Sequence, residues 1–533
     1  MAFPTSEQLW SVEFVLCRVP LQLMHKALSK KTTFNRLLFP ETVVAPTPNT
    51  TGKPPVLYNS KIATSNQQLE AITSILSQPP GSIPFIISGP PGTGKTITIV
   101  EAILQIIDRD PDARVLACAP SESAADAIAQ RLIQYNQNDI LRLIAPSRPL
   151  EHVPAELLKV TSADKAGIFL IPAKKHLTRF RIIVSTCVTA SFPFGARIQL
   201  SGFTHIFVDD AGQAMEPEVM IPIKNVADSK TNVILSGDPK SLGPVIHSPV
   251  ARAFGLGRSY LERLLAMEIY KHRASHGTTV ATLSTNYRSH PAISRLPGDL
   301  LDYDGTDPHE NPHIIKEFGK WRELVNRSFP VIFHGVIGGY KPEGQRRYPS
   351  CFNQEEISVI KYYVKSLRQF GLADGDIGII APYSAQCQKI RLTFKGASDI
   401  MIGNTEHFRG QERKAIIIST VRSNQNEVEP ELRYGSGFLA NPREFNASIT
   451  RARGLLIEIG NPSILALDPV WRKFIRLVRA NGNLKGEAIS DVELDVEDGG
   501  AHILSEHQQE RSRLERSIID WAAAMSNSRD ENE

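Results

Sequence analysis

The stretch GPPGTGKT, residues 89–96, decides the fold. It follows the apolar run IPFIIS (83–88) and precedes TITIVEAILQII (96–107), which has helical spacing. The pattern GxxxxGK[ST] requires this strand–loop–helix context. Its glycines let backbone N–H groups close around phosphates, and the helix N-terminus adds the positive end of its dipole. The sequence therefore predicts a phosphate-binding loop made of Gly89, Pro90, Pro91, Gly92, Thr93, Gly94, Lys95 and Thr96.

Four side chains in and beyond this loop have predicted roles. Lys95 is expected to reach the β- and γ-phosphates, and the Thr96 hydroxyl to hold Mg²⁺. The run HIFVDD (205–210) ends in two aspartates. In this context Asp209 is the expected partner of Mg²⁺, and Asp210 is expected to polarise the attacking water. The sequence thus predicts binding of a nucleoside triphosphate with a metal ion.

Short buried-type strands alternate with segments of helical spacing on both sides of the loop. This alternation is typical of an α/β fold with parallel sheets and helices on both faces. Two sheets of similar size are expected, because a second set of strands follows at PVIFH (330–334), DIGIIA (376–381), AIIIST (415–420) and LLIEIG (455–460). The predicted organisation is an N-terminal segment at 1–60, a first domain at 61–275 with a helical insertion at about 142–180, a second domain at 276–475, and an acidic linker and C-terminal helix at 476–533.

Composition excludes some classes of protein. A hydrophobic content of 41% and a charged content of 22% are ordinary for a globular chain of 533 residues. The five cysteines are scattered without a CxxC pair, which argues against a disulfide framework or a zinc module. No basic and apolar leader opens the chain, and no apolar run is long enough to span a bilayer, so no membrane partner is expected.

The second sheet narrows the use of the nucleotide. We find no NKxD motif of the kind that selects guanine, so ATP is favoured. A single-domain kinase or GTPase needs no second sheet. In a motor ATPase, by contrast, a second domain closes over the nucleotide bound to the first. The second domain then supplies arginines that neutralise charge on the transferring phosphoryl group. Candidate arginines lie in NYRSHP (286–291) and SITRAR (448–453).

An ordered series of motifs resembles the superfamily-1 RNA helicases of the up-frameshift type. The series is GPPGTGKT, APSESAAD, VSTCVTAS, DDAGQA, GDPKSLGPV, NYRSHP, APYSAQ, HFRGQER and NPREFNASITRAR. The segments DDAGQAMEPE and ARAFGLGRSYLERL (251–264) most resemble the branch that holds Armitage and the Moloney leukaemia virus ten protein. The resemblance covers roughly 60–470. It implies two tandem RecA-like P-loop NTPase domains.

The resemblance also implies roles in nucleotide binding. Gln68 matches the glutamine that reads the adenine edge, and Tyr287 matches an aromatic residue that stacks on the base. Arg288 and Arg451 match the two arginine fingers. Glu412 matches the acidic residue that holds the ribose or the γ-phosphate network. With Lys95 and Asp210, these last three make up the predicted catalytic set.

Nucleic-acid contacts follow from the same resemblance. The matching positions are Pro120, Ser121, Thr186, Pro382, Tyr383, Asn441 and Arg443. Such contacts go mainly to sugar and phosphate, so little sequence preference is expected. The implied activity is 5′-to-3′ movement on single-stranded RNA and separation of RNA duplexes. The implied setting is a monomer that works with ribonucleoprotein or silencing-complex proteins, in the cytoplasm or alternatively in the nucleus.

Four positions depart from the family pattern. Asp210 replaces the catalytic glutamate, and its side chain is shorter by about one C–C bond; a misplacement of about 1 Å can cost on the order of 100-fold in rate. Ser241 replaces a glutamine that senses the γ-phosphate, and Arg409 replaces the glutamine of EFQGQE. Glu122 replaces an asparagine, which brings a carboxylate near the expected phosphate backbone unless the side chain turns away. The branch also carries more folded sequence before its motor than the 60 residues here.

Three functions remain open from the sequence. The first is an ATP-dependent RNA helicase or RNA-translocating ATPase. The second is an ATP-binding RNA clamp or scaffold in which the changes at Asp210 and Ser241 have weakened hydrolysis. The third is a DNA helicase, because related motors act on DNA.

Overall fold

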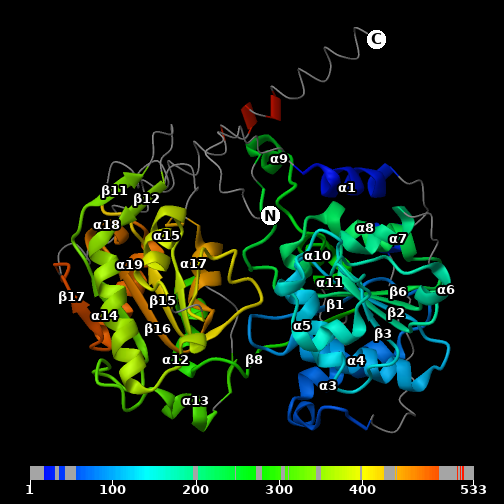
Figure 1. The fold of residues 1–533 in the computed structure, drawn as a ribbon, viewed down its shortest axis with the longest axis horizontal. Coiled ribbons are helices and arrows are strands. Elements are labelled where there is room, and N and C mark those ends of the chain that lie inside the picture. The colour runs from blue at the N-terminus through cyan, green and yellow to red at the C-terminus, as the bar shows by residue number, and fades with distance from the viewer. Residues whose placement is uncertain are drawn as a thin grey trace.

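A computed structural model of the chain shows two α/β lobes side by side (Figure 1). The structure describes residues 17–29, 35–41, 56–195, 202–246, 248–271, 279–301, 307–309, 311–343, 350–396, 399–424, 438–439 and 441–490, with positions 513, 516, 517, 519 and 520. The predicted acidic linker at 491–500 and most of the predicted C-terminal helix lie outside the described residues. Within the described part, no helix combines the length and the apolar character needed to cross a membrane.

The first lobe is built on a sheet of seven parallel strands among the described residues. Its strands are short runs of β-branched and small apolar residues, as expected for a sheet covered on both faces. In spatial order they are β3 (Ile140–Arg142), β4 (Ile182–Thr186), β2 (Val115–Ala119), β5 (His205–Val208), β6 (Asn232–Gly237), β1 (Phe85–Ser88) and β7 (Val280–Thr282).

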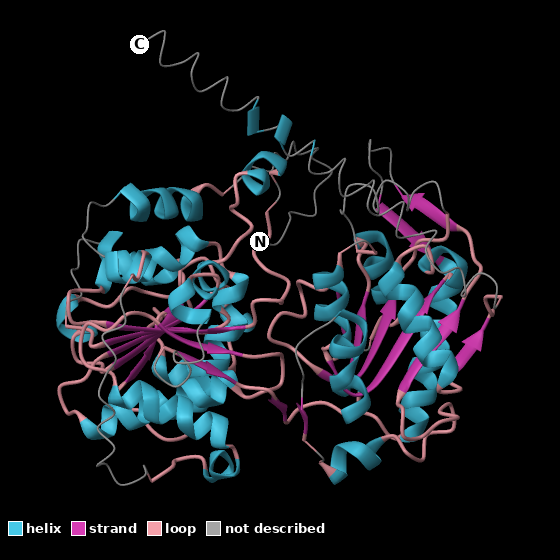
Figure 2. Cartoon of the chain, turned by 180° about the vertical axis from the view of Figure 1, so that it is seen from behind, coloured by secondary structure: helices cyan, strands magenta, loops and turns pink. Residues whose placement is uncertain are grey.

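Helices cover both faces of this sheet, as Figure 2 shows from behind. Alternate residues of each strand point to opposite faces: Phe85 and Ile87 pack in one core and Ile86 in the other. The first core lies under α3 (Asn66–Ser77), α4 (Lys95–Arg109) and α5 (Glu122–Leu132). The second core lies under α8 (Glu216–Val226), α10 (Tyr260–Leu265) and α11 (Glu268–Lys271).

The second lobe repeats this plan with six parallel strands among the described residues. In spatial order they are β14 (Met401–Gly403), β13 (Ile377–Ile380), β15 (Arg413–Ser419), β16 (Ala452–Gly460), β10 (Val331–Gly335) and β17 (Leu484–Gly486). One face packs against α12 (Pro291–Leu301), α17 (Pro442–Ile449) and α19 (Pro469–Ala480), and the other against α14 (Gln354–Phe370) and α15 (Ser384–Thr393). The sequence prediction of two tandem RecA-like domains is confirmed.

Small elements complete the two lobes. A parallel pair of short strands, β8 (Thr285–Asn286) and β9 (Asp307–Pro308), lies between the lobes in Figure 1. A hairpin of β11 (Tyr340–Glu343) and β12 (Ser350–Asn353) stands beside the second sheet. The remaining short helices are α2 (Asn35–Leu38), α6 (Lys174–Leu177), α7 (Phe192–Gly195), α9 (Pro249–Ala253), α13 (Pro312–Glu317) and α18 (Pro462–Leu465).

The strand pairing shifts two of the expected domain boundaries. The boundary between the domains was expected at 275/276, but β7 pairs with β1 of the first sheet, through Ile86 and Val280 among others. The second domain was expected to end at 475, but β17 pairs with β10 of the second sheet. Three-residue strands at the sheet edges are too short for a sequence pattern to reveal. We propose a division after 282 and an end of the second domain near 490.

The expected helical insertion at about 142–180 consists of short pieces. Between β3 and β4 lie two 3₁₀ turns, Leu150–His152 and Ala155–Val160, and the single-turn helix α6. Its prolines explain why longer helices do not form there. The insertion contributes Leu157, Val160 and Phe169 to the core beneath α5.

The described part of the N-terminal segment packs against the first lobe. Helix α1 (Val19–Ser29) lies over α8 in Figure 1 and buries Met24 and Ala27 in the shared core. The Arg36 guanidinium donates to the carbonyls of Ser82 (2.7 Å), Asp228 (2.8 Å) and Thr231 (3.0 Å). Burial lowers the pKa of Arg36, and the carboxylate of Asp228 opposes this shift only in part. This segment is therefore part of the first lobe's structure.

We expect Arg36→Ala to destabilise the first lobe. Hydrogen bonds to a charged group contribute about 1.5–3 kcal/mol, so the loss of this cluster should lower the free energy of unfolding by roughly 2 kcal/mol. Urea unfolding and limited proteolysis of the intact chain measure the change. Arg18→Ala, at an exposed position just before α1, is the control and should leave both measurements unchanged. Equal effects of the two substitutions would contradict the assignment.

Candidate functional site

The phosphate-binding loop joins β1 to α4 at the carboxyl edge of the first sheet. Gly92 (φ 87°) and Gly94 (φ 88°) have the left-handed backbone that glycine adopts without strain. A Cβ at position 94 would lie 2.1 Å from Nε2 of Gln68, so a side chain there would displace Gln68 in addition to straining the backbone. The Lys95 ammonium donates to the carbonyls of Gly89 (2.7 Å) and Pro90 (2.9 Å). The loop is thus folded as its sequence predicts.

Thr96 and Asp209 meet directly beneath this loop. The Thr96 hydroxyl donates to Oδ2 of Asp209 at 2.6 Å. The other carboxylate oxygen of Asp209 accepts from the Ser236 hydroxyl and from the backbone N–H of Asp210 (3.0 Å). Asp209 is 2% exposed, so its orientation is fixed by these contacts. A hydroxyl and a carboxylate side by side are ligands that suit Mg²⁺.

Asp210 has an unusual backbone and an unusual charge environment. Its φ of 52° lies in the left-handed region, which aspartate enters more readily than most residues. Burial raises the pKa of Asp210 to about 6, and Asp209 adds to the rise, while Lys95, Arg451 and Arg409 oppose it. Asp210 therefore faces cations from both lobes and stays mostly ionised at neutral pH.

Lys95 lies among the same groups. Burial lowers the pKa of the Lys95 ammonium, and Arg288 lowers it further. The carboxylates of Asp238, Asp210 and Asp209 raise it. The loop lysine and the two aspartates that follow β5 therefore share one electrostatic environment.

The segment NYRSHP contacts the backbone of the phosphate loop. The side-chain amide of Asn286 donates to the Pro91 carbonyl (3.0 Å), and the backbone N–H of Tyr287 donates to the Gly92 carbonyl (3.0 Å). The Tyr287 ring packs against His309 with a centroid separation of 5.0 Å. Gln68 lies on the other side of the loop and donates to the Thr93 carbonyl at 3.1 Å.

The two predicted finger arginines reach the cleft from the second lobe. Arg288 donates to the Thr450 carbonyl (2.7 Å) and contacts Glu412 at 3.5 Å. Arg451 donates to the carbonyls of Ala447 (2.9 Å) and Phe408 (3.4 Å). Burial lowers the pKa of Arg451 to about 10 and Arg288 lowers it further, while Glu412, Asp210 and Asp238 raise it.

A small cavity of about 20 Å³ lies between the lobes at this point. Residues of both lobes line it, among them Pro91, Ser241, Arg409, Asn446 and Arg451. Four buried polar atoms of its lining have no hydrogen-bond partner among the described residues: Oγ of Ser241, Oγ1 of Thr405, Nε of Arg409 and Oδ1 of Asn446. Buried polar atoms normally have partners. Their concentration here suits a polar ligand or ordered water in the cleft.

The predicted nucleic-acid residues of the first lobe follow β2 and β4. Ser121 caps the N-terminus of α5, where its hydroxyl accepts from Ala124 N–H at 3.2 Å, and Pro120 precedes it. Thr186 is 6% exposed, and its hydroxyl is held by Thr189 at 2.7 Å. The structure therefore brings Thr186 to the predicted edge of the sheet but uses its hydroxyl internally.

The predicted nucleic-acid residues of the second lobe lie after β13 and at the start of α17. Pro382 and Tyr383 are partly exposed, and the Arg422 guanidinium lies 4.8 Å from the Tyr383 ring centroid. Asn441 caps α17 by accepting from Arg443 N–H at 3.1 Å. The Arg443 side chain crosses the cleft and contacts Glu262 at 3.1 Å. The Asn441 and Arg443 side chains thus have structural partners already.

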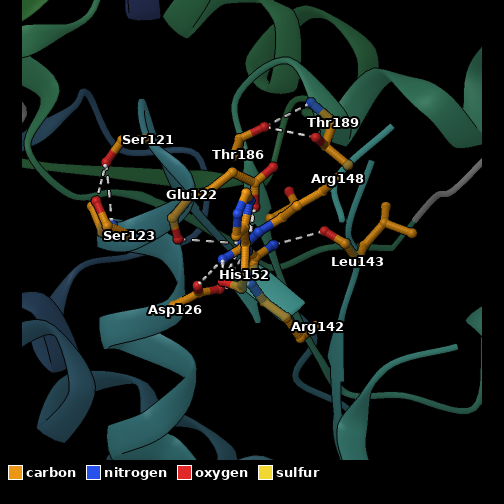
Figure 3. Close-up of polar contacts among 12 residues, drawn as sticks. Ser121, Glu122, Ser123, Asp126, Arg142, Leu143, Arg148, His152, Thr186 and Thr189 are labelled. Atoms are coloured by element: carbon orange, nitrogen blue, oxygen red, sulfur yellow. Dashed lines mark hydrogen bonds and ion pairs between the residues drawn. The ribbon is translucent and has the colours of Figure 1, made fainter. Parts of the chain in front are cut away.

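Glu122 belongs to an ion-pair network with two arginines and a second carboxylate (Figure 3). Its carboxylate contacts Arg142 at 2.5 Å and Arg148 at 3.0 Å. The same arginines contact Asp126 at 2.9 and 2.6 Å. Burial lowers the pKa of Arg148, but Asp126 and Glu122 raise it by more, so its net shift is upward. Two guanidinium groups balance two carboxylates, and the electrostatic conflict expected from the sequence does not arise.

Sequence reasoning missed several residues that shape the site. Ser236 orients Asp209, Asn286 ties NYRSHP to the phosphate loop, and Arg142 and Arg148 neutralise Glu122. A buried serine at a strand end carries no signal of its own in a single sequence. Both arginines lie in the segment LRLIAPSRP (141–149), whose sequence alone does not indicate that they meet Glu122.

We expect Arg142→Met to destabilise the first lobe strongly. Arg142 is 0% exposed, and the substitution leaves two carboxylates against one guanidinium. Breaking a buried pair costs about 3–5 kcal/mol. Urea unfolding checks the value. Arg131→Met, on the same helix as Asp126 and bonded to one backbone carbonyl, should cost much less. A cost near zero for Arg142→Met would refute the network's structural role.

Comparisons with known proteins agree with this geometry. Two family models, both described as AAA domain, match the chain: one covers residues 63–167 and 159–249, and the other covers 256–463. Each match corresponds to most of one lobe.

Three curated relatives are similar over most of the chain. Putative helicase mov-10-B.1 of Danio rerio is 37% identical over 91% of this chain and 50% of its own length. RNA helicase Mov10l1 of Homo sapiens is 38% identical over 80% of this chain and 36% of its own length. Probable RNA helicase armi of Drosophila melanogaster is 32% identical over 79% of this chain and 39% of its own length. The chain spans half or less of the length of these relatives. It belongs to the superfamily-1 RNA helicases of the up-frameshift type, in the branch of Armitage and MOV-10.

Proposed function

We propose that the chain is an ATPase that binds ATP with Mg²⁺ in the cleft and uses its hydrolysis to move along RNA. One observation carries the proposal: the Thr96–Asp209 contact under the phosphate loop faces a cleft into which the second lobe brings Arg288 and Arg451. A protein that only bound a nucleotide in its first lobe would not need cations from the second. Family membership supports the same conclusion.

The residues present fit ATP and Mg²⁺. Gly89–Thr96 would hold the phosphates, Gln68 the adenine edge, and Tyr287 the base. Thr96 and Asp209 would hold Mg²⁺, which would supply neutralisation of phosphate charge. The Thr96–Asp209 contact and the unpaired oxygen of Ser241 in the cleft support this assignment.

Asp210 would accept a proton from the attacking water. The bond from the water oxygen to the γ-phosphorus forms as the bond to the β–γ bridging oxygen breaks. Lys95, Arg288 and Arg451 would stabilise the charge that moves onto the leaving oxygens. Glu412 would orient Arg288, which it contacts at 3.5 Å. Asp210 is ionised enough for this task, since its pKa of about 6 lies near the operating pH.

RNA would cross the carboxyl edges of both sheets. The segments at Pro120–Ser121, Thr186, Pro382–Tyr383 and Asn441–Arg443 all follow strands or begin helices at these edges. Because such edges offer backbone N–H groups and hydroxyls, contacts to sugar and phosphate are expected. We further propose 5′-to-3′ movement by a monomer, in the cytoplasm, together with ribonucleoprotein or silencing-complex proteins.

A steady-state ATPase assay with and without single-stranded RNA tests the function. We expect RNA to stimulate turnover and Lys95→Ala to abolish it. Asp210→Asn should lower kcat by about 100-fold or more, because general-base catalysis contributes roughly 10²–10⁴-fold. Asp210→Glu should raise kcat by about 10-fold if reach is limiting, since a gap of about 1 Å can cost 100-fold.

The outcomes separate the alternatives. RNA binding without ATP turnover above that of Lys95→Ala would favour the ATP-binding RNA clamp. That alternative is based on Asp210, whose side chain is shorter than the glutamate of the family pattern, and on Ser241, which replaces a glutamine. A competition between RNA and DNA strands of one sequence tests the third alternative. Preference for the DNA strand would overturn the RNA assignment.

We also expect Tyr383→Ala to weaken binding of single-stranded RNA. Stacking of a base on an aromatic ring contributes about 1–3 kcal/mol, so the dissociation constant should rise by roughly 10-fold. Fluorescence anisotropy at fixed salt measures it. Tyr362→Ala, on the outer helix α14 and 49% exposed, is the matched control. Equal dissociation constants for the two variants would remove Tyr383 from the RNA path.

A further inference from the structure

Arg409 lies in the turn HFRGQER, at the position where the family pattern has glutamine. Its guanidinium crosses the cleft and donates from Nη2 to the Gly243 carbonyl of the first lobe at 3.1 Å. Gly243 belongs to the loop GDPKSLG, which also carries Ser241. The second lobe therefore holds the loop that lines the predicted γ-phosphate side of the cleft.

The backbone of the same residue contacts a second loop of the first lobe. The Arg409 carbonyl accepts from the Ser123 hydroxyl at 3.3 Å. The Ser123 hydroxyl also lies 3.2 Å from that of Ser121, the predicted nucleic-acid contact that caps α5 (Figure 3). Arg409 thus joins the nucleotide side and the nucleic-acid side of the first lobe through one residue of the second.

The charge of Arg409 is complementary to the first lobe. Burial lowers the pKa of its guanidinium, while Glu406, Asp210, Glu218 and Glu444 raise it. Two of these carboxylates, Asp210 and Glu218, belong to the first lobe. Arg409 in turn opposes the rise that burial causes in the pKa of Glu218, which reaches about 7. A glutamine has no charge to offer these carboxylates.

We propose that Arg409 is a positioning residue that couples nucleotide binding to nucleic-acid binding by tying the Gly243 loop and the Ser123 loop to the second lobe. The inference rests on the proposed function. Both contacts join the two lobes, so a separation of the lobes would break them. Each ligand that favours closure therefore favours the other, and by linkage the two affinities change by the same factor, typically about 5–150-fold.

The experiment measures this coupling factor without hydrolysis. The affinity of a fluorescent oligouridylate for the full chain is measured with and without a non-hydrolysable ATP analogue and Mg²⁺. We expect about a 10-fold difference for the natural chain, within the range of such couplings. Arg409→Gln, which restores the family residue, should reduce the factor to near 1. Arg409→Lys, which keeps the charge, should retain part of it.

Two further variants make the result decisive. Ser123→Ala removes the contact to the Arg409 carbonyl, along with the contact to the Ser121 hydroxyl, and should also lower the factor, even if Arg409→Gln proves unstable. Arg368→Gln removes a partly exposed ion pair with Asp374 within the second lobe and should leave the factor unchanged. Binding of both ligands with an unchanged factor in Arg409→Gln and Ser123→Ala overturns the coupling role alone. Failure of the natural chain to bind either ligand overturns the proposed function as well.

Discussion

The hydrogen bond between Thr96 and Asp209 is the interaction on which the rest of the site depends. It forms because β1 and β5 are parallel strands of one sheet, so the loop after β1 and the aspartates after β5 emerge at the same edge. Ser236, at the end of β6 between them, fixes the carboxylate. Because Asp209 is fixed, the adjacent Asp210 is held close to Lys95. The arginines of the second lobe then face charged groups of the first lobe that are already in place.

The cleft is governed by the balance of buried charge. Asp209, Asp210 and Asp238 raise the pKa of Lys95, and Asp210 and Asp238 raise that of Arg451. Arg288 lowers the pKa of both Lys95 and Arg451. The same balance holds at Glu122, near the predicted nucleic-acid contacts. There Arg142 and Arg148 neutralise the carboxylates of both Glu122 and Asp126. A carboxylate that looked unfavourable for RNA binding is therefore a structural residue. The four departures from the family pattern thus differ in kind: Glu122 is compensated locally, Arg409 adds a contact between the lobes, and Asp210 and Ser241 face the cleft.

Much of the fold could be predicted because its signals are local. A buried strand followed by a glycine-rich loop and an amphipathic helix reports its own structure, and nearly all of the expected strands recur in the two sheets. The domain boundaries were predicted less accurately than the strands. The edge strands β7 and β17 have three residues each, and only their pairing with β1 and β10 assigns them to a sheet. Thr186 and Asn441 were predicted to contact RNA, and this stays a prediction. Their internal hydrogen bonds, from Thr186 to Thr189 and from Arg443 N–H to Asn441, could not be read from the sequence.

The sequence by itself determined the phosphate loop and the two α/β domains, since each depends on residues close together in the chain. Only the tertiary structure decided which distant groups neutralise one another. Arg142 reaches Glu122 from the end of β3 and Arg148 from the insertion after it, and Arg409 reaches Gly243 from the other lobe. The physical reason is that the free energy of a buried charge depends on its partners in space, and spacing along a single chain does not specify them.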